Sequence, residues 1–247
     1  MSATALAGGY VAGQEIVRGV DLRAETGELT CVIGPNGAGK STALKLVAGL
    51  LHRSAGRVDL DGRDLTGLSP QDVAASGLVF VPQERNVFAA LSVEENLRMG
   101  AWGVHGSLSA RLADAYDRFP QLRARRRAAA GSLSGGQRQV LAVAAALMAQ
   151  PRALLLDEPT AGLAPQPAGE LLDLVRNLAR SGLAVLMVEQ NALDALLASD
   201  RAVVMVDGRV ARTGPAAAVA ADPDIRRLFL GGASPAEASA TGKGQAA

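Results

Sequence analysis

Gly34-Pro35-Asn36-Gly37-Ala38-Gly39-Lys40-Ser41 is the stretch that decides the fold. An apolar run precedes it at 29–33, and a helical pattern follows it at 42–48. This order of strand, glycine loop and helix is the context in which G-x-x-x-x-G-K-[ST] acts as a phosphate-binding loop. Glycines let the backbone curl so that its N–H groups point at phosphate oxygens, and the helix N-terminus adds partial positive charge. The stretch therefore predicts a site for a nucleoside triphosphate.

Two side chains of the loop complete this prediction. Lys40 adds a full positive charge near the terminal phosphates, and the Ser41 hydroxyl is placed to bind Mg²⁺. The simpler alternative is a tight glycine turn that leaves an exposed lysine. That alternative does not explain why all eight residues fit the motif while a strand pattern precedes them and a helical pattern follows them.

The composition of the 247-residue chain limits the classes of protein it can be. Hydrophobic residues make up 49%, enough for the core of one large domain or of a domain with an inserted subdomain. Lys and Arg number 25 against 24 Asp and Glu, so there is no basic excess for nucleic acid as the principal partner. The single cysteine, Cys31, cannot form an internal disulfide, so we expect a buried thiol and a reducing compartment.

No pattern in the sequence predicts that the chain itself enters a membrane. Residues 1–9 contain no basic residue, so we expect no secretory signal. The apolar run at 140–149 is about half as long as a bilayer span. We therefore expect a cytoplasmic protein whose membrane role depends on a partner.

The order of the predicted elements indicates an α/β fold with a mostly parallel sheet. Apolar strands at 78–81, 153–157 and 183–188 alternate with helical patterns, as they do in parallel sheets. Short strands ahead of the phosphate loop predict an N-terminal antiparallel β subdomain. Asp61-Gly62 and Asp207-Gly208 mark hairpins.

Helical patterns replace strand patterns in the middle of the chain and predict an inserted helical subdomain at about 83–150. The core then comprises about 1–82 and 151–230, and a tail of small and polar residues at 231–247 is expected to be disordered. Within the insertion, the basic run 123–127 is expected to form the solvated face of a helix. A weaker alternative is that it meets acidic groups of a partner.

A second motif ends the predicted strand at 153–157. Leu154-Leu155-Leu156-Asp157-Glu158 places a carboxylate at the end of a buried strand, which is costly without a positive partner. Mg²⁺ shared with Ser41 would supply that charge, so Asp157 is the expected metal-side carboxylate. We expect Glu158 to project to the opposite side of the extended chain and to polarise water for attack on the γ-phosphate. The simpler alternative is a strand that ends in a polar turn.

A third motif, Leu133-Ser134-Gly135-Gly136-Gln137, directly precedes a long alanine-rich helix. Ser134 is a good N-cap residue, and Gly135 and Gly136 leave the backbone amides bare. The helix N-terminus then offers a second anion site. Taken alone, the segment is only a loop; its meaning comes from its occurrence with the other two motifs.

In this order, with a helical insertion between the first two, the three motifs resemble the nucleotide-binding subunit of ATP-binding cassette (ABC) transporters. The resemblance implies the ABC ATPase fold, ATP and Mg²⁺ as cofactors, and a site shared by two subunits that face each other head to tail. It implies that Tyr10 stacks on adenine, although a strand aromatic is the simpler explanation of that residue. It also implies that Gln83 reaches Mg²⁺ and the attacking water, and that the block 86–97 meets the transmembrane partner.

Two positions depart from the pattern common in this family. Gln190 follows a strand where relatives carry a histidine, and the histidines of this chain, His52 and His105, lie elsewhere. A glutamine can donate a hydrogen bond to the γ-phosphate but cannot carry positive charge. Ala164 lies where many relatives have an aspartate. Both departures resemble the LivF-type ATPase subunit of branched-chain amino-acid importers.

The resemblance therefore implies an ATPase that drives import of branched-chain amino acids, held at the inner face of the cell membrane by transmembrane permease subunits. A second ATPase subunit, the same chain or a paralogue, would complete the site. A periplasmic or extracellular solute-binding protein would deliver the substrate. The alternatives are the same ATPase type serving urea or amide import, a soluble ABC ATPase in assembly of another complex, and a nucleotide-gated binding module, against which Glu158 argues.

The candidate site residues follow from the motifs and from the resemblance. The candidate catalytic residues are Glu158, Gln190 and Gln83, and the candidate Mg²⁺ ligands are Ser41, Asp157 and Gln83. Nucleotide binding is assigned to Tyr10, Gly34, Asn36, Gly37, Gly39, Lys40, Ser41 and Thr42, and to Ser134, Gly135, Gly136 and Gln137.

Overall fold

The phosphate loop follows β3 (Leu29–Ile33), a strand that is buried at every position. The computed structural model describes residues 1–103 and 106–230, without some side chains of the last helix. β3 lies inside a six-stranded sheet of order β10-β9-β3-β8-β7-β6, in which β10 is antiparallel to β9 and the other neighbours are parallel. The remaining strands are β6 (Leu78–Val81), β7 (Ala153–Asp157), β8 (Ala184–Val188), β9 (Arg201–Val206) and β10 (Arg209–Pro215).

Alternation along these strands sends side chains to the two faces of the sheet. Val32 joins one hydrophobic cluster, whereas Cys31 and Ile33 join another. Both faces are therefore covered, which explains why the parallel strands are apolar at most positions. The predicted fold class is confirmed.

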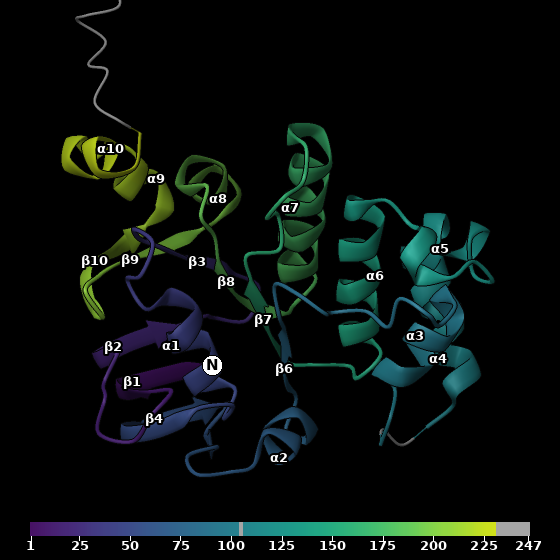
Figure 1. The fold of residues 1–247 in the computed structure, drawn as a ribbon, viewed down its shortest axis with the longest axis horizontal. Coiled ribbons are helices and arrows are strands. Elements are labelled where there is room, and N and C mark those ends of the chain that lie inside the picture. Colours follow the sequence, from purple (N-terminus) through teal and green to yellow (C-terminus); the bar gives the residue numbers. More distant parts are fainter. Residues whose placement is uncertain (104–105, 231–247) are drawn as a thin grey trace, which may run out of the picture.

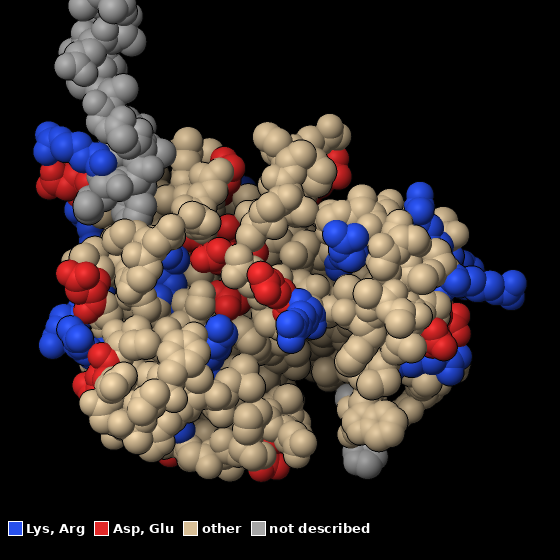
Figure 2. Space-filling view, in the orientation of Figure 1, with Lys and Arg blue, Asp and Glu red and all other residues tan. Residues whose placement is uncertain are grey.

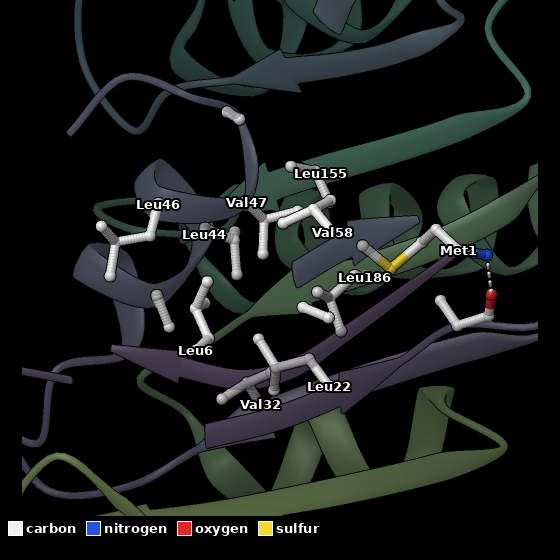
Figure 3. Close-up of a cluster of buried hydrophobic side chains, with 14 of the residues drawn as sticks. Met1, Leu6, Leu22, Val32, Leu44, Leu46, Val47, Val58, Leu155 and Leu186 are labelled. Atoms are coloured by element: carbon white, nitrogen blue, oxygen red, sulfur yellow. Dashed lines mark hydrogen bonds between the residues drawn. The ribbon is translucent and has the colours of Figure 1, made fainter. Parts of the chain in front are cut away.

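A second, antiparallel sheet of order β2-β1-β4-β5 covers the helix that follows the phosphate loop, α1 (Lys40–Val47). Figure 1 shows α1 between this sheet and the larger one. Figure 3 shows the core that results, with Leu44 of α1, Leu6 of β1 and Leu186 of β8 in one cluster. The strands are β1 (Ser2–Gly9), β2 (Val17–Arg23), β4 (His52–Leu60) and β5 (Arg63–Asp64).

Helices cover the other face of the large sheet, over the second cluster. The sequence patterns did not predict the last two of them, which have five and eight residues. The helices on this face are α7 (Pro165–Arg180), α8 (Ala192–Ala198), α9 (Ala216–Ala220) and α10 (Pro223–Leu230). The short α2 (Pro70–Ala75) packs near β6.

A helical group lies beside α7 and has a hydrophobic cluster of its own (Figure 1). α6 belongs to this group and also packs on α7 and β6, so it connects the group to the large sheet. The boundaries of the predicted helical subdomain, at about 83 and 150, stay a prediction. The group comprises α3 (Val93–Gly100), α4 (Leu108–Arg118), α5 (Pro120–Ala124), a 3₁₀ turn (Ala130–Ser132) and α6 (Gly135–Leu147).

The prediction that the basic run 123–127 forms one helix face is wrong. α5 ends at Ala124, and Arg125, Arg126 and Arg127 lie in exposed turns. The chain leaves the helix because its backbone pairs with the start of α3: the Glu94 N–H donates to the Arg126 carbonyl oxygen at 3.0 Å. The arginines are solvated as expected, but not on a helix.

No helix among the described residues is long and apolar enough to cross a bilayer. The predicted disordered tail at 231–247 and His105 lie outside the described residues.

Candidate functional site

The glycines of the phosphate loop are required by the backbone itself. Gly37 and Gly39 have φ angles of +81° and +91°, in the left-handed region that favours glycine. Gly34 passes so close to β9 that a Cβ there would lie 2.2 Å from the Met205 carbonyl oxygen. Any larger residue at Gly34 would therefore force the loop away from the sheet.

Lys40 forms hydrogen bonds with the backbone of its own loop. Its side chain is buried, and Nζ donates to the carbonyl oxygens of Gly34 at 2.8 Å and Pro35 at 3.2 Å. Burial lowers the pKa of Lys40, and the carboxylates of Glu158 and Asp157 oppose that shift. The loop thus carries a buried cation within the electrostatic reach of two carboxylates that follow one another at the end of β7.

The first turn of α1 faces the same loop. The helix begins at Gly39 without a side-chain cap, so no side chain satisfies its first N–H groups. Ser41 is half-buried in that turn, Thr42 is buried, and Asn36 is exposed in the loop. An uncapped helix N-terminus next to a lysine is suited to an anion.

Asp157 is placed to hold a hard cation. It is 3% exposed, and among the described residues its Oδ1 has no hydrogen-bond partner. Such an oxygen, with a hydroxyl like that of Ser41, fits the oxygen ligands that Mg²⁺ prefers. The described residues contain no group of three or more His, Cys, Asp or Glu side chains that could hold a metal, so nucleotide phosphates and water would have to supply the remaining ligands.

Glu158 does not continue the extended strand, so the prediction that it projects opposite Asp157 by strand alternation is wrong. Its φ is +46°, in a region where non-glycine residues are uncommon and often functional. The chain turns because the Glu158 N–H donates to the Val188 carbonyl oxygen at 2.9 Å and the Ala161 N–H donates to the Glu158 carbonyl oxygen at 3.1 Å. The side chain meets Gln83, whose Nε2 donates to Glu158 Oε2 at 3.1 Å. The structure therefore brings these two predicted catalytic residues together.

Gln190 lies two residues past the end of β8 and is exposed. The residue before it, Glu189, was not assigned any role from the sequence, although it is only 2% exposed. Its Oε1 accepts the backbone N–H of Thr160 at 2.9 Å. The sequence does carry a signal for Glu189, because an acidic residue directly follows the apolar strand predicted at 183–188. A similar pattern, an acidic residue at the end of an apolar strand, identified Asp157.

Tyr10 lies beside α1. The residue is 56% exposed, and Lys45 Nζ of α1 lies 5.8 Å from the ring centroid and donates to the hydroxyl at 3.4 Å. An exposed aromatic ring beside the loop helix is suited to stacking on a base.

The third motif forms the start of α6. Ser134 is the N-cap as predicted: its Oγ accepts the Gln137 N–H at 3.3 Å, and Gln137 Oε1 accepts the Ser134 N–H at 3.1 Å. The two glycines also allow close packing that the sequence patterns did not predict. A Cβ on Gly135 would lie 3.1 Å from Leu163 Cδ2, and one on Gly136 would lie 3.0 Å from Pro167 Cβ.

The structure does not bring all candidate residues to one place. In Figure 1, α1 and α6 lie on opposite sides of β6 and β7. Figure 2 shows acidic side chains gathered near the centre of this face, between the two-sheet part and the helical group. The phosphate loop, Gln83, Asp157 and Glu158 thus form one cluster. We call this cluster the half-site, because the predicted site also includes the segment Ser134–Gln137, which lies apart from it.

Comparisons with known proteins agree with this arrangement. A family described as ABC transporter matches residues 17–161. A high-affinity branched-chain amino acid transport ATP-binding protein, BraG of Pseudomonas aeruginosa, is 37% identical over 90% of this chain and 96% of its own. The probable LivF protein of Archaeoglobus fulgidus is 42% identical over 86% and 91%. The lipopolysaccharide export ATP-binding protein LptB of Escherichia coli is 34% identical over 89% and 92%.

A solved structure shares the fold over nearly its whole length. The ADP conformation of MJ1267, an ATP-binding cassette of an ABC transporter, superimposes with a TM-score of 0.82 at 27% identity, covering 94% of this chain and 98% of that one. The matched family, the relatives and the phosphate-loop geometry all give the same assignment. The chain belongs to the ABC transporter family and is one of its nucleotide-binding subunits, an ATPase coupled to transport.

Proposed function

We propose that this chain hydrolyses ATP to drive import of branched-chain amino acids, as the ATPase subunit of a larger transporter. The hydrogen bond of 3.1 Å between Gln83 and Glu158, beside the buried Lys40, carries the hydrolytic part of this proposal. The substrate part is supported by two relatives named for branched-chain amino acid transport, which are 37% and 42% identical to this chain.

Each residue of this half-site has a distinct part in hydrolysis. Lys40 and the N–H groups of the loop stabilise negative charge on the terminal phosphates. Glu158 accepts a proton from the attacking water, and Gln83 holds that carboxylate in place by donating to it. Gln190 donates a hydrogen bond to the γ-phosphate. Asp157 and Ser41 would hold Mg²⁺, which supplies positive charge between the phosphates when it is bound.

The second half of the site comes from another subunit. Ser134–Gln137 present a helix N-terminus that their own chain leaves apart from the phosphate loop (Figure 1). Two subunits arranged head to tail would place this terminus on the γ-phosphate of the facing loop. ATP then closes the dimer, and loss of the γ-phosphate opens it, which moves the transmembrane partner between two states.

The permease docks beside the helical group. A groove of about 350 Å³ runs between β6 and the ends of α3 and α6. Phe88, Met99 and Trp102 line it and are 57%, 42% and 84% exposed. Figure 2 shows a hollow between the lobe that carries α2 and the helical group. Exposed aromatic and methionine side chains beside a groove are typical of a surface that receives a partner segment.

Glu158→Gln tests the hydrolytic part. The variant should bind ATP with unchanged affinity and form a stable ATP-bound dimer, while turnover falls about 100-fold or more because the amide cannot accept a proton. Phosphate release and size-exclusion chromatography with ATP measure both effects. Undiminished turnover would remove Glu158 from its role as base.

Reconstitution tests the substrate part. With its permease and solute-binding protein in liposomes, the complex should show ATPase activity stimulated by leucine. Stimulation by urea alone, or by lipopolysaccharide alone as the LptB likeness would favour, would contradict the choice of substrate. A pull-down from membranes that recovers no integral membrane protein would favour a soluble ABC ATPase instead.

A further inference from the structure

Glu189 is a buried carboxylate outside the motifs that define the family. It directly follows β8, and its side chain is 2% exposed. Its backbone N–H donates to the Val32 carbonyl oxygen of β3 at 3.3 Å. The residue therefore lies at the edge of the sheet from which the phosphate loop also leaves.

This carboxylate joins two segments of the half-site. Oε1 accepts the N–H of Thr160 at 2.9 Å, and Oε2 accepts the N–H of Gln190 at 3.3 Å. Thr160 lies in the turn that begins at Glu158, and that turn is also held by the Glu158 N–H on the carbonyl oxygen of Val188 at 2.9 Å. The Glu189 side chain thus connects the segment that carries Glu158, the proposed general base, with Gln190, the proposed contact of the γ-phosphate.

A buried position such as that of Glu189 is unfavourable for a carboxylate whose only role is packing. Burial raises its pKa to about 7; the hydrogen bonds from Thr160 and Gln190 oppose that shift, and the carboxylate of Glu158 adds to it. An apolar side chain would fill this space without burying an ionisable group. Buried titratable groups with charged neighbours are concentrated at functional sites.

We propose that Glu189 is a positioning residue that sets the distance between Glu158 and Gln190. The inference rests on the proposed function, in which these two residues flank the attacking water. In a site of this kind, a displacement of about 1 Å costs about 100-fold in rate. ATP binding through Lys40 and Tyr10 does not depend on the hydrogen bonds that Glu189 accepts from Thr160 and Gln190. A substitution at Glu189 should therefore lower turnover without changing ATP binding.

Glu189→Gln is the first test. Its amide keeps one oxygen acceptor but places an NH₂ group where the second backbone N–H needs an acceptor, so one of the two bonds is lost in either orientation. We expect kcat for ATP hydrolysis to fall about 10-fold or more, while KM and the affinity for a fluorescent ATP analogue stay within about 2-fold. Glu189→Asp keeps the charge but is one methylene too short to reach both donors, and it should show the same separation.

Asp200→Ala is the matched control. Asp200 Oδ2 accepts the Leu29 N–H at 2.9 Å at the opposite end of β3, so this variant removes a comparable carboxylate-to-backbone bond away from the site. It should lower the melting temperature and leave kcat unchanged.

The outcomes distinguish this inference from the function on which it rests. If Glu158→Gln is inactive but Glu189→Gln keeps kcat within about 2-fold of wild type, the positioning role is overturned and the proposed function stands. A variant that loses ATP binding together with turnover, or that does not fold, would show a structural role and would also overturn it. Undiminished turnover in Glu158→Gln would instead contradict the proposed function itself.

Discussion

The two helix N-termini of the proposed nucleotide site are built in different ways. α1 begins at Gly39, in the left-handed region, and has no side-chain cap. α6 begins with a complete capping box between Ser134 and Gln137, and its glycines have no left-handed φ. The first terminus leaves its amides for a ligand and depends on glycines in the left-handed region, whereas the second satisfies one of its amides, that of Gln137, with its own cap.

The difference extends to charge. The phosphate half of the site contains Lys40, Asp157, Glu158 and the buried Glu189. The segment Ser134–Gln137 contains no ionisable side chain and can attract an anion only through the helix dipole and its N–H groups. Substitutions in the phosphate loop and in the segment Ser134–Gln137 should therefore impair different properties of the protein.

The largest effect is expected at Gly34. Gly34→Ala would place a Cβ 2.2 Å from the Met205 carbonyl oxygen, so the loop must move. We expect a loss of about 3 kcal/mol in the free energy of unfolding and about 100-fold weaker ATP binding. Urea denaturation and titration with a fluorescent ATP analogue measure these quantities.

Gly37→Ala is the matched control for that substitution. A Cβ at Gly37 meets nothing within 4 Å, so the cost is that of the left-handed φ alone, about 1–2 kcal/mol. Equal losses in both variants would mean that the close approach of Gly34 to β9 costs no more than the left-handed φ of Gly37 does.

The second prediction concerns pH and uses the charged half of the site. The pKa of Glu189 is raised from 4.5 to about 7, so the folded state binds its proton more tightly than the unfolded state does. Its contribution to stability is fully present below about pH 4.5 and is lost as pH rises through about 7, a change of about 3 kcal/mol. Glu189→Gln removes this titration, so wild type should lose about that much stability relative to the variant between about pH 4 and pH 8.

Urea denaturation at both pH values checks this prediction. The groups that act on Glu189 are the donors at Thr160 and Gln190 and the carboxylate of Glu158. Burial raises the pKa of the neighbouring Cys31 to about 12, so that thiol stays neutral over this range. Parallel stability curves for wild type and variant would show that Glu189 titrates as it does in the unfolded chain.

The comparison also separates what the sequence could predict from what it could not. The phosphate loop, the strand at 153–157 and the cap at Ser134 depend on residues within a few positions, and each was predicted correctly. The turn at Glu158 depends on a carbonyl oxygen of β8, at Val188, and the fit of Gly136 depends on Pro167 of α7. Contacts between distant segments leave no periodic pattern, so these features required the structure.

The third prediction concerns a substitution at the N-terminus of α6 that leaves the N-terminus of α1 unchanged. Gly136→Ala puts a Cβ 3.0 Å from Pro167 Cβ, which must move by a few tenths of an ångström. Alanine favours a helix by about 1 kcal/mol over glycine, so stability should change by less than about 1 kcal/mol. ATPase activity should fall about 10-fold because the added methyl group shifts the N–H groups that face the partner's nucleotide.

ATP binding to the monomer should be unchanged in Gly136→Ala, the reverse of the result expected for Gly34→Ala. Weaker binding by the Gly136→Ala monomer would mean that the two termini do not act on separate faces of the nucleotide.

The smallest effect is expected from the cap of α6. Ser134→Ala removes the acceptor of the Gln137 N–H at 3.3 Å and should cost about 1 kcal/mol of unfolding free energy. Ser69→Ala is the matched control, since Ser69 caps α2 in the same way by accepting the Asp72 N–H at 3.2 Å. Both variants should lose similar stability, but only Ser134→Ala should lose ATPase activity, by a factor of about 5. If both lose equal stability and neither loses activity, the hydroxyl of Ser134 serves its own helix and not the nucleotide, and the second terminus acts through its backbone alone.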